Sequence, residues 1–205
     1  MSRLRSRDER GQAFPIYVVV VAGLLFAALA FFAVGQASIV RSDAQGAADA
    51  AALAAAGDAR DHLVPGIDLL TLKPEDWKKV LEGDLLYAGG ACGAARDFAA
   101  KNDATADCFA DPPRFRVEAK TTGTVGDSVV PGVSGRHGTG NATAVIEPRC
   151  QLGAPVAEPS PSPGGEEKPS SVEIKCKGGV IKFDPAKPEP WSTLARKLFA
   201  VRLVD

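Results

Sequence analysis

The sequence predicts an α+β fold: a single transmembrane helix at the amino terminus that continues as a long alanine-rich helix, followed by a small disulfide-stabilised domain outside the cytoplasm. Two observations predict the helix. Residues 13–40 contain no charged side chain, and residues 45–56 consist mainly of alanine, the strongest helix former. The small domain is predicted by short candidate elements interspersed with glycine, proline and four cysteines.

The uncharged stretch has the length and composition of a membrane span. Residues 14–34 are apolar, and about 20 helical residues cross a hydrocarbon core roughly 30 Å thick. The apolar region of a secretory signal peptide is shorter, about 7–15 residues, which favours a retained anchor. A cleavage site at Ala37-Ser38 remains the alternative, whereas a buried core helix is disfavoured because the run is apolar on every face.

The charges on the two sides of this span predict its orientation. Four arginines lie within the first ten residues, whereas the basic residues that follow the span are Arg41 and then Arg60. Positively charged flanks tend to stay in the cytoplasm. We therefore expect a single-pass protein of the cell membrane, with a cytoplasmic amino terminus and an extracytoplasmic carboxyl-terminal domain.

The alanine-rich half is expected to continue the helix to about His62, before Val64-Pro65-Gly66 ends it. Four alanines recur at helical spacing and form one smooth stripe. They are Ala44, Ala48, Ala51 and Ala55. The stripe favours close lateral packing against other helices, and the alternative is a helix that is merely rich in alanine.

Two sequence motifs resemble a known family. Arg10-Gly11-Gln12-Ala13 opens the apolar run, and a Q-x-A-A-D-A-A-A-L-A sequence follows it at residues 45–54. Over residues 8–57 the chain resembles the amino-terminal domain of Flp pilus-assembly TadE/TadG-like proteins. The residues of the chain that match this family signature are Gly11, Gln45, Ala47, Ala48, Asp49, Ala51, Ala52 and Leu53. The alanine-rich composition also resembles that of actinobacterial proteins.

The resemblance implies a function and partners. It implies a membrane-anchored, non-enzymatic structural or accessory protein of Tad pilus assembly or a related secretion system. The partners it implies are the lipid bilayer, other Tad membrane proteins, or a second copy of the chain through the alanine-rich helix. Prepilins of this system resemble a pattern with Glu and Tyr at the fifth and sixth positions after the cleaved Gly. After Gly11 these positions hold Ile16 and Tyr17, which favours a TadG-like anchor over a pilin subunit.

Beyond residue 63 the sequence predicts short elements. The expected helices are 72–81, 92–101 and 190–198, and the expected strands are 115–121, 142–146, 172–176, 180–183 and 199–203. In the second helix Ala95, Phe98 and Ala99 are expected to face inward. The predicted organisation is a basic cytoplasmic tail (1–12), the span and stalk helix (13–63), an outer domain (64–152), a flexible Pro/Ser-rich segment (153–171) and a part that completes the outer domain (172–205).

Four cysteines allow three pairings. The expected pairs join neighbours in the sequence: Cys92–Cys108 and Cys150–Cys176. The first would close a small helix-bearing loop, and the second would tie off the flexible segment, stabilising the domain by about 3 kcal/mol for a loop of this size. A metal site is the alternative, and it fits poorly because no C-x-x-C occurs and both histidines are distant in sequence.

Nothing in the sequence predicts a catalytic, cofactor-binding or metal-binding residue. The net charge of −1 gives no basis for nucleic-acid binding, and no phosphate-binding loop predicts a small-molecule substrate. The segment 132–136 departs from the G-x-S-x-G nucleophile motif because Arg136 replaces its last glycine. The alternative function is a membrane-tethered binding module of the cell envelope, unrelated to pili, with contacts in a mobile loop over residues 123–140.

Overall fold

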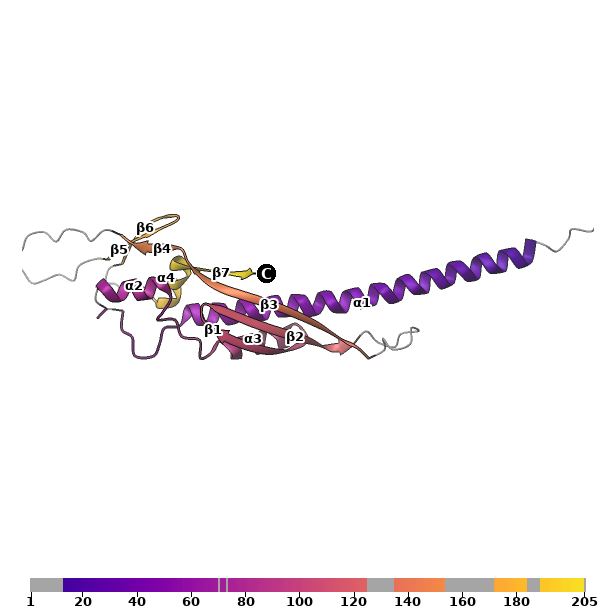
Figure 1. The fold of residues 1–205 in the computed structure, drawn as a ribbon, viewed down its shortest axis with the longest axis horizontal. Helices are drawn as coiled ribbons and strands as arrows, with labels where there is room; N and C mark the ends of the chain where they lie inside the picture. The colour runs from indigo at the N-terminus through magenta and orange to yellow at the C-terminus, as the bar shows by residue number, and fades with distance from the viewer. Residues whose placement is uncertain are drawn as a thin grey trace, which may run out of the picture.

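The structure is a computed structural model that describes residues 13–69, 71–72, 74–124, 135–153, 172–183 and 189–204. Its longest element is α1 (Ala13–Asp61), an uninterrupted helix of 49 residues. The amino-terminal half of α1 projects away from the rest of the protein, and the carboxyl-terminal half lies alongside a β-sheet (Figure 1). The α+β prediction, with one long apolar helix followed by a small domain, is therefore confirmed.

The other elements are short. The helices are α2 (Pro74–Glu82), α3 (Ala91–Lys101) and α4 (Trp191–Leu198). The strands are β1 (Ala104–Asp111), β2 (Arg114–Thr124), β3 (His137–Pro148), β4 (Cys150–Leu152), β5 (Val172–Cys176), β6 (Gly179–Phe183) and β7 (Phe199–Val204).

The strands form two antiparallel sheets. The larger has the order β1-β2-β3-β7 and the smaller the order β4-β5-β6. In β2 every second side chain is buried, namely Phe115, Val117 and Ala119, as alternation in the sequence predicts. These side chains contribute to one core together with α1, α3 and the larger sheet. The opposite face of β2 is exposed, so one face of the sheet packs on α1 and the other faces solvent.

Two features of the larger sheet differ from the sequence prediction. Strand β1 is not predicted, because Ala and Asp dominate it and both have low strand propensity; pairing with β2 along its whole length determines its conformation. The loop is expected over residues 123–140, but both ends of that range belong to strands. Strand β2 continues to Thr124 and β3 already begins at His137, while residues 125–134 lie outside the described part of the chain.

The core beyond α1 is small and aromatic. Trp77, Phe115 and Phe199 are almost fully buried, and the Trp77 ring lies 4.9 Å from that of Phe183. Helix α4 closes this core because its Leu194 and Leu198 are buried. The prediction that Phe98 faces inward is wrong. Its side chain is 43% exposed and lies under the ammonium group of Lys101, so α3 buries only its alanine face.

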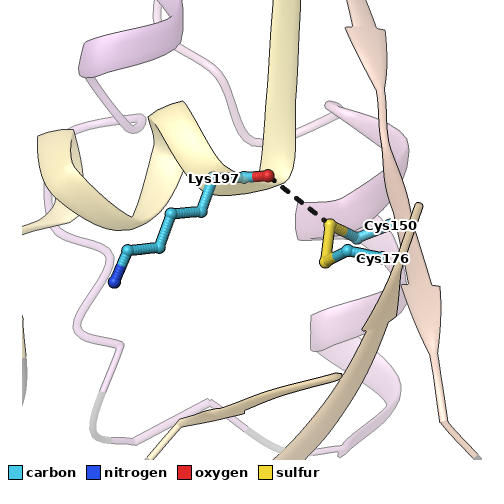
Figure 2. The surroundings of a disulfide bond; sticks show 3 residues. All are labelled: Cys150, Cys176 and Lys197. Carbon is cyan, nitrogen blue, oxygen red and sulfur yellow. Dashed lines mark hydrogen bonds between the residues drawn. A yellow bond between two sulfur atoms is a disulfide. The ribbon is translucent and has the colours of Figure 1, made fainter. Parts of the chain in front are cut away.

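Two disulfides connect the outer elements. Cys92 of α3 is bonded to Cys108 of β1, and Cys150 of β4 is bonded to Cys176 of β5. The second lies beneath α4, where the Sγ atom of Cys150 is 3.7 Å from the carbonyl oxygen of Lys197 (Figure 2). Both pairs join neighbours in the sequence: the first ties strand β1 to helix α3, and the second joins two strands of the smaller sheet. Of the segment expected to be flexible, residues 154–171 lie outside the described residues.

Candidate functional surface on the long helix

The amino-terminal half of α1 exposes large apolar side chains. Residues 13–40 carry no charge, and α1 is the one helix in the described part of the chain that is long and apolar enough to cross a membrane. None of its most apolar window is buried within the protein. The exposed side chains include Phe14, Ile16, Tyr17, Val19, Leu24, Leu25, Phe26, Phe31, Phe32 and Val34. Proteins in water rarely expose an apolar surface of this size, whereas the hydrocarbon core of a membrane accommodates it.

The carboxyl-terminal half of α1 buries small side chains instead. The alanines at one face of this half are at most 1% exposed: Ala44, Ala47, Ala48, Ala51, Ala52, Ala55, Ala56 and Ala59. They lie in the same core as residues of β2, β3 and α3. The protein's own sheet and helix α3 therefore occupy the stripe that the sequence predicts as a surface for other helices or a second copy. Helix propensity and side-chain spacing show that such a face exists, but they do not specify which partner covers it.

The close approach of β3 to α1 depends on glycine. A Cβ atom on Gly138 would lie 2.3 Å from the carbonyl oxygen of Val40, and one on Gly140 would lie 2.5 Å from that of Ala44. No side chain can occupy such positions, so only glycine allows the strand backbone to lie directly on the helix. This contact explains why a strand forms where the sequence suggests a glycine-rich loop.

The family-signature residues divide into an apolar and a polar set. Their alanines belong to the buried face, whereas the Gln45 Nε2 group donates hydrogen bonds to Asp49 Oδ1 at 2.8 Å and to the carbonyl oxygen of Asn141 at 2.9 Å. Gln45 therefore links two turns of α1 to β3. Leu53 is 37% exposed, and Gly11 lies outside the described residues. A pattern search cannot find the partner of Gln45, because Asn141 is 96 residues away and contributes only its backbone.

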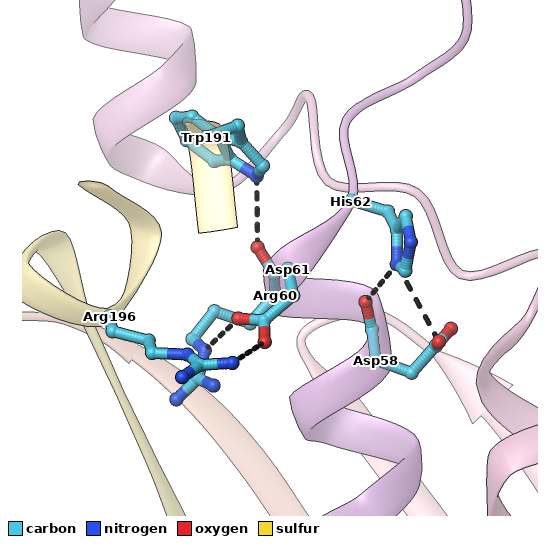
Figure 3. Close-up of polar contacts among 6 residues, drawn as sticks. All are labelled: Asp58, Arg60, Asp61, His62, Trp191 and Arg196. Atoms are coloured by element: carbon cyan, nitrogen blue, oxygen red, sulfur yellow. Dashed lines mark hydrogen bonds and ion pairs between the residues drawn. The ribbon is translucent and has the colours of Figure 1, made fainter. Parts of the chain in front are cut away.

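A second polar cluster fixes the end of α1 (Figure 3). Asp61 accepts hydrogen bonds from Arg60 and from Arg196 of α4, at 2.8 and 2.9 Å, and the Trp191 indole donates to the carbonyl oxygen of Arg60 at 3.1 Å. Burial raises the pKa of Asp61, but the two arginines lower it more, so the pKa lies below its usual value. The cluster joins the long helix to α4 and favours the charged carboxylate.

Three observations concern the candidate chemical groups among the described residues. No group of three or more His, Cys, Asp or Glu side chains among them is arranged to hold a metal ion. His137 Nδ1 is hydrogen-bonded to the carbonyl oxygen of Thr121 at 2.7 Å, and Ser134 lies outside the described part of the chain. A cavity of about 710 Å³ lies between α2 and strands β4 and β5, and the second disulfide forms part of its wall.

Comparison with known proteins supports the sequence resemblance. Residues 11–58 match the family model described as "Putative Flp pilus-assembly TadE/G-like". The match covers the apolar half of α1 and most of its alanine-rich half, and it confirms the resemblance over that segment. No curated protein and no solved structure matches the chain. The family match supports a role related to Flp pilus assembly, while the actinobacterial origin stays a prediction.

Proposed function

We propose that this protein is a single-pass membrane anchor that acts as a non-enzymatic structural accessory in Flp pilus assembly. Residues 14–34 cross the bilayer, the amino terminus lies in the cytoplasm, and the sheet-containing domain lies outside. The family match to residues 11–58 supports the connection to pili. The membrane orientation follows from the arginines that precede the span.

One observation carries this proposal: α1 is continuous, yet its two halves have opposite surroundings. The apolar half has large exposed side chains, and the alanine half forms the centre of the outer domain. A helix of this kind transmits the position of the membrane rigidly to the outer domain, because no loop separates them. An anchor for a larger assembly needs such a connection.

Ile16 supports an accessory role rather than that of a pilin subunit. Ile16 occupies the position that holds Glu in the pattern that prepilins of this system resemble. Its side chain is 66% exposed on the apolar half of α1. Placing a carboxylate inside a membrane costs about 2.5–3.5 kcal/mol on insertion scales, so we expect one there only where it has a function. Its absence here fits a retained anchor. The binding-module alternative relies on the predicted loop whose centre, residues 125–134, lies outside the described residues.

Cysteine labelling in intact cells tests the orientation. Ser2→Cys and Lys120→Cys are introduced separately, because all four natural cysteines are in disulfides. A membrane-impermeant maleimide is expected to label Lys120→Cys in intact cells and Ser2→Cys only after lysis. Labelling of Ser2→Cys in intact cells would contradict the proposed orientation.

A deletion strain tests the role in pilus assembly. Surface pili are expected to disappear, and the full chain is expected to restore them, whereas a chain that starts after residue 36 is not. Normal pili in the deletion strain would refute the proposal. The mass of the extracted protein then separates the alternatives: an intact or Met-trimmed start supports the anchor, a start at Gln12 means prepilin-type processing, and a start near residue 38 means a signal peptide.

A further inference from the structure

We propose that a polar hollow between α1 and β3 binds the phosphate group of an outer-leaflet phospholipid and so holds the outer domain against the membrane surface. This inference deepens the proposed function, since it rests on α1 being a membrane anchor. The hollow has a volume of about 460 Å³. Its lining comprises Val40, Arg41 and Gln45 of α1 and residues 137–141 of β3.

The hollow begins just outside the headgroup layer along α1. If the apolar core ends near Val34, Arg41 lies about 10 Å further along the helix at 1.5 Å per residue. The headgroup region adds roughly 5–7 Å on each side of the hydrocarbon core. A long arginine side chain can extend back over this distance toward the phosphates. The Arg41 guanidinium group can therefore extend to phosphates at the outer edge of the headgroup layer.

The charges of the hollow favour an anion. Arg41 is exposed, and its guanidinium group has no hydrogen-bond or ion-pair partner among the described residues. No Asp or Glu lines the hollow. Asp43, its neighbour on α1, lines a different hollow, and Asp49 accepts the hydrogen bond from Gln45. A guanidinium group left without a carboxylate partner suits a phosphate, which it can bind with two parallel hydrogen bonds.

The start of β3 forms the other wall of the hollow. His137 Nδ1 carries a proton there, because its partners are the carbonyl oxygens of Thr121 and Gly123, at 2.7 and 3.2 Å. In the neutral ring Nε2 is then an acceptor, so His137 offers no further donor to an anion. Arg41 is therefore the group of the lining that attracts a phosphate.

The hollow is already formed in the structure, where α1 and β3 are in direct contact. Gly138 and Gly140 place the strand backbone directly on Val40 and Ala44, and Gln45 bonds the strand at Asn141. Binding therefore needs no ordering of the backbone, which lowers its entropic cost. A bound phosphate would connect helix and sheet at the point where the chain leaves the membrane.

Native mass spectrometry of the full chain in detergent tests this site. Phosphatidylglycerol is titrated against the wild type, Arg41→Gln and the control Arg116→Gln, an exposed arginine on the face of β2 opposite α1. The wild type and the control are expected to bind one lipid tightly. Arg41→Gln is expected to lose at least about tenfold in affinity, as for the loss of one charge-assisted hydrogen-bonded contact.

The outcomes separate this inference from the proposed function. Equal lipid binding by Arg41→Gln and the wild type overturns the lipid site, provided that circular dichroism shows the same fold. Displacement of the lipid by an excess of inorganic phosphate, with equal binding of that ion alone, shows a soluble-anion site and also overturns it. If alkaline carbonate extracts the wild type from membranes, the proposal that α1 is a membrane anchor is wrong. Resistance of both proteins to carbonate leaves the anchor intact whatever the lipid result.

Discussion

The two halves of α1 share one helical backbone but have opposite side-chain sizes and opposite surroundings. In residues 14–34 the side chains are large, apolar and exposed, whereas in residues 44–59 the inward face consists of alanines that are at most 1% exposed. Large side chains keep neighbouring backbones apart and need a nonpolar environment around them. Small side chains let a strand lie directly on the helix. The difference teaches that side-chain volume, more than hydrophobicity, determines which half becomes part of the domain.

The largest effect is expected from charges in the apolar half. Leu24→Arg combined with Leu25→Arg should disfavour membrane insertion by about 5–7 kcal/mol, at about 2.5–3.5 kcal/mol for each charge on insertion scales. Carbonate extraction of cell membranes measures the result. Leu53→Arg in the other half, at a partly exposed position, is the control and should leave insertion unchanged. Unchanged insertion of the double variant would remove the proposed distinction between the halves.

The next effect concerns the contact of the alanine half with β3. Gly140→Val should destabilise the outer domain by about 3 kcal/mol or more, because a Cβ atom would lie 2.5 Å from the Ala44 carbonyl oxygen and must displace backbone. Gly46→Ala is the control, since no atom lies within 4 Å of its Cβ position, and it should be neutral or stabilising by up to about 1 kcal/mol. Chemical denaturation of the full chain in detergent measures both. Equal stabilities would show that the helix and strand do not touch here.

A smaller effect is expected at the polar link. Gln45→Leu removes the hydrogen bonds to Asp49 and to Asn141, and should lower the free energy of unfolding by about 1–2 kcal/mol. Gln151→Leu serves as the matched control, because Gln151 is exposed at the edge strand β4. The same denaturation experiment measures both variants. If Gln151→Leu lowers the free energy of unfolding as much as Gln45→Leu does, the signature glutamine has no special role in the fold.

The smallest effect is expected at the end of α1 and depends on pH. The pKa of Asp61 is lower in the folded protein than in the unfolded chain, because Arg60 and Arg196 stabilise its charge. Its contribution is fully present above the unfolded pKa of about 4 and is lost as the pH falls through the folded value. Asp61→Asn should therefore cost up to about 1 kcal/mol at pH 7 and progressively less in acid. Unfolding measured from pH 7 to pH 3 tests this, and a cost independent of pH would contradict it.

Several elements could be predicted from local sequence. The apolar run, the alternation in β2 and the strand at residues 172–176 each depend on neighbours within a few residues, and all agree with the structure. Strand β1 could not be predicted in this way. Its alanines and aspartates have little strand propensity, and only the pairing with β2 and the bond from Cys108 to Cys92 hold it extended.

The candidate surfaces divide in the same way. Arg41 is recognisable in the sequence as the first charge after the apolar run. Its neighbours in the hollow, residues 137–141, are almost one hundred positions away, and the sequence suggests only a loop there. The three-dimensional contact between α1 and β3 brings the two segments together. Residue spacing along the chain therefore cannot predict the hollow.

The sequence by itself determined the long helix, its apolar half and the existence of a smooth alanine face, because helix propensity, hydropathy and periodicity are local properties. Only the tertiary structure decided what covers that face. The sequence analysis assigned it to helices of other proteins or of a second copy, whereas in the structure the protein's own sheet and helix α3 cover it. The physical reason is that a stripe of methyl groups accepts any closely approaching backbone, and Gly138 and Gly140 allow β3 to approach more closely than a helix with side chains could.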